Sequence, residues 1–330
     1  MTAMPAAAAR AVVPVLCGPT AAGKSALAMR LAERVGATIV SADSRQLYRG
    51  FDVGTAKPTR EERARVPHEG IDVAEPTERW SAARWAADAE RWLADAHAAG
   101  RPPLVVGGTG FYLRALAERL FEEPELEPAH RERLAGWLER LSMDELRRWV
   151  AAIDPERAAL QRTQLLRAVE VALLTGVRLS AWHRAAARPS RHVLRYLVVD
   201  PGPVLAERIA ARVDAMLAAG WPDEVLALER VVPADAPAWK ASGYDALRRH
   251  LRGELSLDEA RALVTIETRQ YAKRQRTWFR HQLPADAVVR VNPDDPEADA
   301  VALAWWRACA AARPDAPPSP DSPTPHPTLA

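Results

Sequence analysis

One glycine-rich loop near the amino terminus constrains the fold more than any other part of the sequence. The octapeptide GPTAAGKS matches the pattern G-x-x-x-x-G-K-[ST] and lies between an apolar run and a segment of helical periodicity, where this pattern binds phosphate. Backbone N–H groups of such a loop surround phosphate oxygens, Lys24 neutralises charge, and the Ser25 hydroxyl can ligate Mg²⁺. We therefore expect a diphosphate site and a Ser25-bound Mg²⁺. The site comprises Gly18, Pro19, Thr20, Ala21, Ala22, Gly23, Lys24 and Ser25.

Short apolar runs alternate with helical segments from this loop to about residue 120. The predicted strands are residues 12–17, 37–43 and 102–108, and the predicted helices are 25–35 and 81–99. Gly36 and Gly100 follow the two helices, as is typical of helix ends. Pro14 cannot donate to a sheet, so the first strand is expected to begin at or just after it. The pattern predicts an α/β fold, with a parallel sheet of the P-loop type flanked by helices.

A second kind of pattern begins near residue 122 and predicts an all-helical insertion domain over 122–191. Strand signals disappear there, and helix-start signals repeat at Ser142, three residues before Glu145, and at Asp154, before Pro155. An apolar run at 193–200 restores a strand, and helices are predicted to follow from Pro203 and Ser256. The core is therefore expected to comprise residues 12–121 and 192–312, preceded by a flexible segment (1–11) and followed by a disordered, proline-rich tail (313–330).

Composition excludes several classes of protein. Two cysteines in 330 residues exclude a disulfide framework or a cysteine-rich zinc site and favour the reducing cytoplasm. No apolar run approaches the roughly 20 residues that a membrane span needs, so we expect no membrane partner. Lys and Arg total 45 and Asp and Glu total 43, so bulk charge does not indicate nucleic acid and any such evidence must come from local clusters.

Three polar residues lie at or directly after predicted strands. Asp43 ends the second strand and Thr109 follows the third, so both are expected beside the phosphate loop at the carboxyl edge of the sheet. Asp43 could ligate Mg²⁺, cap a turn or accept a proton. A kinase or NTPase needs a further metal-binding aspartate after an apolar strand, and Asp200 is the candidate. Because Pro201 follows it, a strand-ending turn remains open as the alternative.

Two predicted helices carry regularly spaced basic residues. Arg208 and Arg212 share a face and could stabilise a departing diphosphate, or could lie on a solvated face beside Glu207 or Asp214. In the helix from Ser256, one basic stripe favours a phosphate backbone as its partner, and an apolar stripe is expected to face the core. The basic stripe comprises Arg269, Lys273, Arg276 and Arg280, and the apolar stripe comprises Leu257, Val264, Tyr271 and Trp278. His68 is expected to be structural.

Taken together, eight segments resemble the tRNA dimethylallyltransferases of the bacterial type. They are GPTAAGKS, ADSRQLYRGFDVGTAKP, PHEGIDV, VGGTGFYLRAL, RAVEV, ERIAARVDAML, SGYDAL and ETRQYAKRQRTWFR, which stand in the family's order and spacing over about residues 12–285. The resemblance implies transfer of a dimethylallyl group from dimethylallyl diphosphate to the exocyclic amine of the adenosine on the 3′ side of the tRNA anticodon. It further implies that the phosphate loop and Ser25-bound Mg²⁺ hold the diphosphate.

The resemblance also assigns residue roles. Asp43 would accept the amine proton, and Thr109 with Arg212 would stabilise the departing diphosphate. The anticodon stem-loop would contact the insertion and several core segments, and the enzyme would be a monomer. The implied tRNA-binding residues are Asp43, Ser44, Arg45, Gln46, Thr109, Thr163, Gln164, Leu165, Leu166, Arg167, Lys240, Ala241, Ser242, Gly243, Tyr244, Asp245, Lys273, Arg274, Gln275, Arg276, Thr277, Trp278, Phe279 and Arg280. Gln164 departs from the pattern, since relatives usually carry an arginine there.

Three other functions stay open at this point. A prenyltransferase acting on free adenine nucleotides would not need the insertion or the basic helix. A small-molecule kinase or NTPase would need Asp200 and ATP turnover. A non-catalytic RNA-binding protein would leave Asp43 and the phosphate loop without a task.

Overall fold

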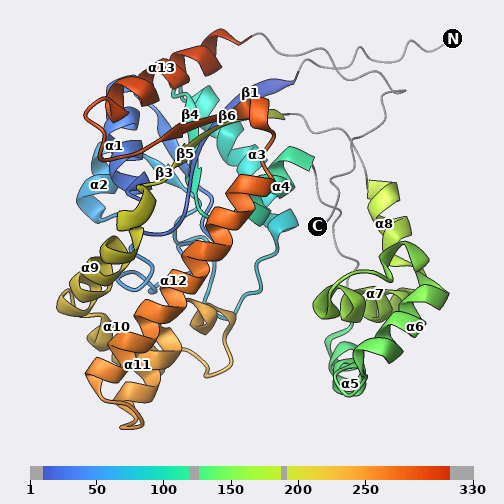
Figure 1. Cartoon of the computed structure of the whole chain (residues 1–330). Coiled ribbons are helices and arrows are strands. Elements are labelled where there is room, and N and C mark those ends of the chain that lie inside the picture. Colours follow the sequence, from blue (N-terminus) through green and yellow to red (C-terminus); the bar gives the residue numbers. More distant parts are fainter. Residues whose placement is uncertain (1–9, 119–125, 187–191, 313–330) are drawn as a thin grey trace, which may run out of the picture. The chain divides into compact units, whose positions relative to one another are not determined.

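The computed structural model describes residues 10–118, 126–186 and 192–312 (Figure 1). The chain divides into two compact units, one formed by Met1–Ala117 with Ser190–Ala330 and the other by Glu118–Pro189. The sequence placed these boundaries at 122 and 191. The expected flexible segment before the first strand falls mostly outside the described residues, and the expected proline-rich tail lies outside them.

The larger unit is built on a six-stranded sheet of order β3-β2-β4-β1-β5-β6, in which all the pairs are parallel. The strands are β1 (Ala11–Cys17), β2 (Thr38–Ser41), β3 (His68–Glu69), β4 (Pro103–Gly107), β5 (His192–Val199) and β6 (Val288–Val291). The central strand β1 is fully buried over Val15–Cys17, as expected for a parallel sheet covered on both faces. The predicted parallel α/β core is therefore confirmed.

The expectation that β1 begins at or after Pro14 is wrong, because the strand begins at Ala11. β1 pairs with β5 along its whole length, including Pro14 opposite Arg195, but it pairs with β4 only from Val15 onwards. Pro14 therefore lies where the strand has a neighbour on one side only. Such a position tolerates a residue without an N–H group.

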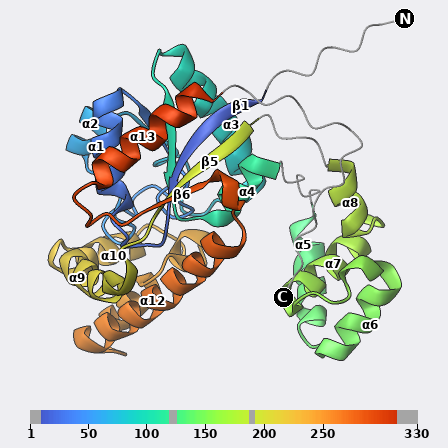
Figure 2. The ribbon, with the colours of Figure 1, turned by 45° about the horizontal axis from the view of Figure 1, so that its top comes forward.

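Helices cover both faces of the sheet (Figures 1 and 2). Helices α1 (Lys24–Val35) and α13 (Ala298–Ala311) pack on one face, where Trp305 and Trp306 join the core. Helices α3 (Ala82–Ala98) and α4 (Gly110–Glu118) lie on the other face, where Trp85 stacks on Tyr112 with ring centroids 4.8 Å apart. The short helix α2 spans Arg60–Arg65. The predicted helices 25–35 and 81–99 are thus α1 and α3.

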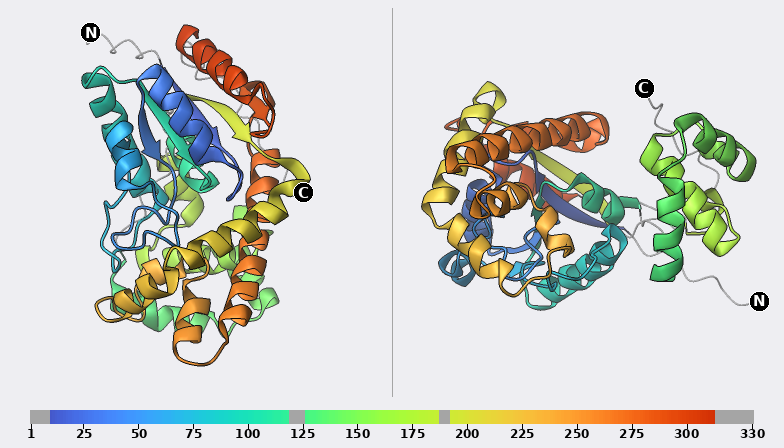
Figure 3. Two further views of the ribbon diagram at one scale, coloured as in Figure 1. Left: turned by 90° about the vertical axis from the view of Figure 1, so that its left-hand side faces the viewer. Right: turned by 90° about the horizontal axis from the view of Figure 1, so that it is seen from below.

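A further group of helices gathers at the carboxyl ends of the strands (Figure 3). It comprises α9 (Leu205–Ala218), α10 (Trp221–Glu229), α11 (Tyr244–Leu251) and α12 (Leu257–His281), with short 3₁₀ turns η2 (Gly202–Val204) and η3 (Pro237–Lys240). A further 3₁₀ turn, η4 (Ala285–Ala287), directly precedes β6 and lies at the opposite, amino-terminal edge of the sheet. Helix α12 begins at the position that the sequence predicts, and there Ser256 caps it and exchanges hydrogen bonds with Glu259. In the larger unit, sequence analysis missed the strands β3 and β6 and the helices α2, α4, α10, α11 and α13.

The smaller unit is all-helical and has its own core. Its elements are α5 (Pro128–Leu138), α6 (Met143–Ile153), η1 (Pro155–Arg157), α7 (Arg162–Thr175) and α8 (Leu179–Ala186). Ser142 and Glu145 form the predicted capping box of α6. The helix predicted to start at Asp154 is only a 3₁₀ turn, because the buried Asp154 Oδ2 instead accepts the N–H of Ser180 at 2.9 Å, in the first turn of α8.

His68 is structural, as expected. It lies in β3, and its Nδ1 is 2.8 Å from the Val66 carbonyl oxygen. Burial lowers the pKa of the ring, because charging it there would cost solvation.

Helix α13 offers a test of the core. Trp305 is 6% exposed, so Trp305→Ala should lower the free energy of unfolding by about 3–5 kcal/mol. On the same helix, Asp299→Asn removes an ion pair with Arg30 in which the side chains are 49% and 50% exposed, and it should cost less than about 1 kcal/mol. Urea denaturation followed by circular dichroism measures both. Equal losses in the two variants would contradict the docking of α13 on the sheet.

Candidate active site

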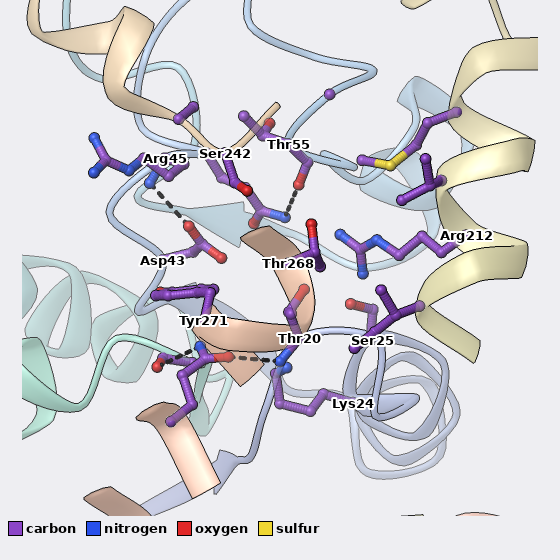
Figure 4. Close-up of a pocket in the computed structure, with 18 of the residues that line it drawn as sticks. Thr20, Lys24, Ser25, Asp43, Arg45, Thr55, Arg212, Ser242, Thr268 and Tyr271 are labelled. Carbon is purple, nitrogen blue, oxygen red and sulfur yellow. Dashed lines mark hydrogen bonds between the residues drawn. The ribbon is translucent and has the colours of Figure 1, made fainter. Parts of the chain in front are cut away.

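A pocket opens at the carboxyl edge of the sheet, in the larger unit (Figure 4). Its polar lining comes from the phosphate loop, the segment after β2 and helices α9 and α12, and its apolar lining comes mainly from α9, α10 and α12. The polar set is Thr20, Lys24, Ser25, Asp43, Arg45, Gln46, Thr55, Arg212, Ser242, Thr268, Tyr271 and Gln275, and the apolar set is Val106, Ile209, Val213, Met216, Trp221, Ala241 and Val264.

The phosphate loop has the backbone that its glycines predict. Gly18 has φ of 151°, and a Cβ there would lie 2.2 Å from the Val199 carbonyl oxygen of the neighbouring strand. Gly23 has φ of 86° and caps the start of α1. The side chains of Thr20, Lys24 and Ser25 line the pocket, while the remaining loop residues supply backbone. The Lys24 ammonium donates to the Pro19 carbonyl at 2.6 Å, which folds it across the loop.

Two of the pocket's cations, Lys24 and Arg212, are desolvated and interact with the Asp43 carboxylate. Burial is the main cause that lowers the pKa of Lys24 to about 8; Arg212 adds to this effect and Asp43 opposes it. Burial also lowers the pKa of Arg212, and Asp43 again opposes the shift. Because both cations are desolvated, an anion that enters the pocket gains more from them than it would in water.

Arg212 resolves an alternative that the sequence left open. It points from α9 into the pocket in Figure 4. Asp214, which the sequence offered as a neighbour of Arg208 and Arg212 on a solvated face, instead pairs with Arg261 at 2.8 Å. Arg208, one turn before Arg212, forms an ion pair with Asp294 beside the phosphate loop. Arg212 therefore faces the pocket, whereas Arg208 lies outside it, next to the phosphate loop.

Asp43 fills one of the roles that the sequence allowed and is also part of the pocket lining. Its Oδ1 accepts the backbone N–H of Arg45 at 2.8 Å, which stabilises the turn after β2. The same carboxylate lines the pocket beside Tyr271 (Figure 4). It therefore caps a turn and also faces the cavity.

Thr109 occupies a different place from the other catalytic candidates. It is not among the pocket-lining residues that the structure describes. Its Oγ1 accepts the N–H of Ser44 at 3.0 Å, and its own N–H donates to Ala42 at 3.2 Å. Thr109 thus holds the segment that carries Asp43.

Helix α12 contributes a polar face to the pocket that sequence analysis did not identify. Val264, Thr268, Tyr271 and Gln275 all line the cavity and follow one another at spacings of four, three and four residues. Burial raises the pKa of Tyr271 to about 12. The basic stripe has the same spacing, so the spacing alone does not distinguish the face that lines the pocket from the face that meets solvent. Tyr271 was expected in the core and Gln275 in the tRNA-binding set.

Gln275 ties α12 to the phosphate loop. Its Oε1 accepts the N–H of Thr20 at 2.8 Å, and its Nε2 donates to the Gly108 carbonyl at 2.8 Å. A Cβ at Gly108 would lie 2.4 Å from that nitrogen, so any side chain there would displace the Gln275 amide. The buried amide therefore connects the helix, the phosphate loop and the end of β4.

The prediction that the whole basic stripe faces outward is wrong at Arg276. This side chain is partly buried, and its Nε donates to Asp200 Oδ2 at 3.0 Å while its Nη2 contacts Asp200 Oδ1 and the Gly202 carbonyl. Asp200 also accepts the N–H of Gly202 at 2.9 Å, so it ends the strand in a turn. The carboxylate that a kinase would use for its metal is occupied by a guanidinium.

Four of the exposed side chains on the carboxyl-terminal half of α12 form a surface that we call the basic face. It comprises Lys273, Arg274, Thr277 and Arg280, all exposed. Within the described residues, no acidic side chain forms an ion pair with Lys273 or Arg280. Gln275 and Phe279 are buried, so their side chains are not on this face. Trp278 packs against Gly110. Leu257, which was expected to face the core, is instead 42% exposed.

The other implied tRNA-binding segments differ in exposure. In the smaller unit, Thr163 and Gln164 are exposed at the start of α7, and Gln164 Oε1 accepts the N–H of Gln161 at 3.2 Å. Leu165 is buried in that unit's core, Leu166 is half-buried, and Arg167 pairs with Glu170. In the larger unit, Lys240, Ser242 and Asp245 are exposed, while Ala241, Gly243 and Tyr244 are buried.

Oxygen donors for a metal are few in the pocket. The described residues hold no group of three or more His, Cys, Asp or Glu side chains that could bind a metal ion. Ser25 lines the pocket next to Lys24. Mg²⁺ commonly binds through substrate phosphates, water and one or two protein oxygens, so this donor set fits Mg²⁺ only in the presence of a phosphorylated ligand. None of the helices in the three described ranges has the length and apolar character that a transmembrane span requires.

Comparisons with known proteins agree with one another. A family model described as IPP transferase matches residues 46–282, and one described as isopentenyl transferase matches residues 11–69. The chain is 44% identical over 274 residues to a tRNA dimethylallyltransferase of Geobacter metallireducens, covering 81% of this chain and 88% of that protein. It is 45% identical over 273 residues to a tRNA dimethylallyltransferase of Anaeromyxobacter sp. (strain K), covering 81% and 90%.

Solved structures give the same result. The full-length tRNA isopentenylpyrophosphate transferase of Bacillus halodurans is 31% identical, with a TM-score of 0.64 and coverage of 91% of this chain and 98% of that one. A eukaryotic dimethylallyltransferase acting on tRNA shares the fold with a TM-score of 0.71 at 24% identity, covering 89% of this chain and 77% of that one.

The lowered pKa of Lys24 predicts a pH dependence for anion binding. Lys24 is protonated only below its pKa of about 8, so the affinity for inorganic diphosphate should fall as the pH rises through that value. Lys24→Met should bind diphosphate more weakly at about pH 7 and should lack this decline, since no titrating cation remains. Isothermal titration calorimetry across about pH 7–9.5 measures both proteins. Identical pH profiles for the parent and the variant would contradict the assignment.

Proposed function

The chain belongs to the tRNA dimethylallyltransferase family and transfers a dimethylallyl group to tRNA, and we propose that the pocket at the carboxyl edge of the sheet is where this occurs. The donor is dimethylallyl diphosphate, and the acceptor is the exocyclic amine of the adenosine on the 3′ side of the anticodon. The observation that carries the proposal is the convergence of Lys24, Arg212 and Asp43 on one cavity. Two cations there face an anionic leaving group, and one carboxylate faces a proton donor.

The diphosphate is bound by the phosphate loop. Its oxygens accept backbone N–H groups and the Thr20 and Ser25 hydroxyls, and Lys24 and Arg212 balance their charge. Ser25 would hold Mg²⁺ together with diphosphate oxygens, and the ion would further neutralise the leaving group. Inside the same cavity, Ile209, Val213 and Met216 of α9 offer an apolar surface for the prenyl chain.

The reaction forms one bond and breaks one. The amine nitrogen attacks the allylic carbon of the donor, the carbon–oxygen bond to diphosphate breaks, and its electron pair leaves with the diphosphate. Positive charge develops on the nitrogen, and its proton passes to the Asp43 carboxylate. Thr109 supports this step by holding the turn that carries Asp43.

The RNA is bound outside the pocket by the basic face. Its cations lie on the same helix as Tyr271 and Gln275, which line the cavity, so an RNA on this face lies close to the catalytic groups. The target base must leave its stack to reach a pocket, as in other enzymes that act on a base. Contacts from the smaller unit, a monomeric state and a cytoplasmic location stay predictions.

The alternative functions are less well supported. The Asp200 carboxylate is held by Arg276, which disfavours its use as the metal ligand of a kinase or NTPase. The basic face and the separate helical unit give RNA a surface that a free nucleotide does not need.

Asp43→Asn tests the proton acceptor. The amide keeps the shape of the side chain but cannot take the proton, so the single-turnover rate should fall by roughly a hundredfold to ten-thousandfold. Binding of tRNA and of dimethylallyl diphosphate should change far less. The measurement is single-turnover prenylation of an anticodon stem-loop with both substrates saturating. A rate within a few-fold of the parent would leave Asp43 with its turn-capping role alone.

Charge reversal tests the basic face. Replacing Lys273 and Arg280 with glutamate should weaken tRNA binding by at least about tenfold. The slope of the logarithm of the binding constant against the logarithm of the salt concentration should become shallower by the equivalent of about two phosphate contacts. The matched control reverses Arg34 and Arg307, which are exposed on α1 and α13 and carry the same total charge. Filter binding over a range of salt concentrations compares the two. If both double variants lose the same affinity, the basic face is not the docking surface.

A further inference from the structure

We propose that Glu224 of α10 is a positioning residue that fixes the wall of the pocket facing the RNA base. The inference rests on the proposed function, because it assigns this wall to the acceptor. Glu224 is not among the pocket-lining residues that the structure describes, so it acts through the residues that it holds.

The Glu224 carboxylate binds a loop about 170 residues away in the sequence. Its Oε2 accepts the backbone N–H groups of Asp52 and Val53 at 2.8 Å and 2.6 Å. Its Oε1 accepts the Gly54 N–H at 3.3 Å and the Tyr244 hydroxyl at 2.6 Å. One carboxylate therefore satisfies three consecutive N–H groups and one phenol.

This loop forms part of the pocket wall. Gly54 and Thr55 line the cavity, and the carbonyls of Thr55 and Ala56 accept hydrogen bonds from Gln46 Nε2 at 3.2 Å and 3.0 Å. Ala56 has φ of 47°, a left-handed conformation that costs free energy for a residue with a Cβ. The loop therefore depends on outside contacts for its shape, and its shape determines where Gln46 lies.

A second part of the wall is held by the same helix. Tyr244, the other partner of Glu224, follows the pocket-lining residues Ala241 and Ser242. Burial raises the pKa of Tyr244 and the Glu224 charge raises it further, so the phenol remains a donor. Trp221, one turn before Glu224, contacts both walls: a Cβ at Gly54 or at Gly243 would lie 2.1 Å or 2.3 Å from its indole ring.

Helix α10 thus sets the separation between the loop at Gly54 and the loop at Gly243. Figure 4 shows Thr55, Ser242 and Arg45 on the side of the pocket away from Lys24. Because the phosphate loop is held by contacts that do not involve α10, such as Thr20 with Gln275, loss of Glu224 should affect the acceptor and leave the diphosphate site intact.

The chemistry requires a carboxylate at this position. Each of its oxygens accepts two hydrogen bonds from four donors that face it. A glutamine would replace one oxygen with an N–H₂ donor that faces further donors, so one pair would lose its acceptor. Glutamine is close in size to glutamate. Glu224→Gln should therefore release part of the loop without changing the volume of the side chain.

The test compares Glu224→Gln with Asp223→Asn, a control that makes the same chemical change at the exposed neighbouring residue. For Glu224→Gln, kcat/KM for an anticodon stem-loop RNA should fall roughly tenfold to a hundredfold, with a raised KM for the RNA. The Kd for dimethylallyl diphosphate should stay within about twofold of the parent, and Asp223→Asn should match the parent in every parameter. Tyr244→Phe removes one of the four donors, so its kcat/KM for the RNA should lie between those of Glu224→Gln and Asp223→Asn.

Diphosphate binding separates positioning from a loss of folded protein. Two results would overturn the proposal. In the first, the number of diphosphate-binding sites per Glu224→Gln molecule falls in proportion to its RNA turnover. In the second, its RNA turnover equals that of the parent. Amide hydrogen exchange at Asp52, Val53 and Gly54 gives a readout without catalysis. These amides should exchange faster in Glu224→Gln than in Asp223→Asn, and equal exchange would also overturn the proposal. A parent enzyme that transfers no prenyl group would instead refute the proposed function, with the exchange result still deciding whether Glu224 holds the loop.

Discussion

Close approach of backbones at the carboxyl edge of the sheet is the constraint on which the pocket depends. A Cβ at Gly107 would lie 2.2 Å from the Ala42 carbonyl oxygen. A Cβ at Gly18 would lie at the same distance from the Val199 carbonyl oxygen. Neighbouring strands can therefore bring the phosphate loop, Asp43 and the end of β4 into one small volume only if these positions lack side chains. The buried amide of Gln275 then closes the arrangement, since it bonds to two of the three segments at once. Catalytic groups from distant parts of the sequence meet because nothing bulky separates the chains that carry them.

Much of this could be predicted from the sequence because the determining patterns are local. The phosphate loop, the second strand and the capping box at Ser142 depend on residues within a few positions of one another, and each appears at the predicted place in the sequence, although the strand ends two residues earlier than expected. The resemblance to a known family added substrates and roles that local patterns could not supply. Helix α13 was missed although it holds Trp305 in the core, because its alanine-rich sequence carries no distinct capping signal.

The errors came from contacts between residues far apart in the sequence. Arg276 looked like one more outward cation, but its partner Asp200 lies 76 residues earlier and occupies it completely. For Asp200 the sequence left a metal ligand and a strand-ending turn open, and only the contact with Arg276 and the turn at Gly202 decide for the second. Glu224 carried no signal in the sequence, because its three N–H partners lie about 170 residues away. Periodicity identifies which residues share a face, but it does not reveal what that face meets.

Helix α12 performs several tasks at once around its circumference. One side lines the pocket with Tyr271 and Gln275, another holds Asp200 through Arg276, and the basic face points outward. Consecutive residues of a helix are rotated by about 100° about its axis. Insertion or loss of one residue between Val264 and Gln275 would therefore turn everything beyond it out of phase, placing cations in the cavity and the buried amide in water. Over this stretch, descendants of the gene can exchange side chains but cannot change the length of the helix.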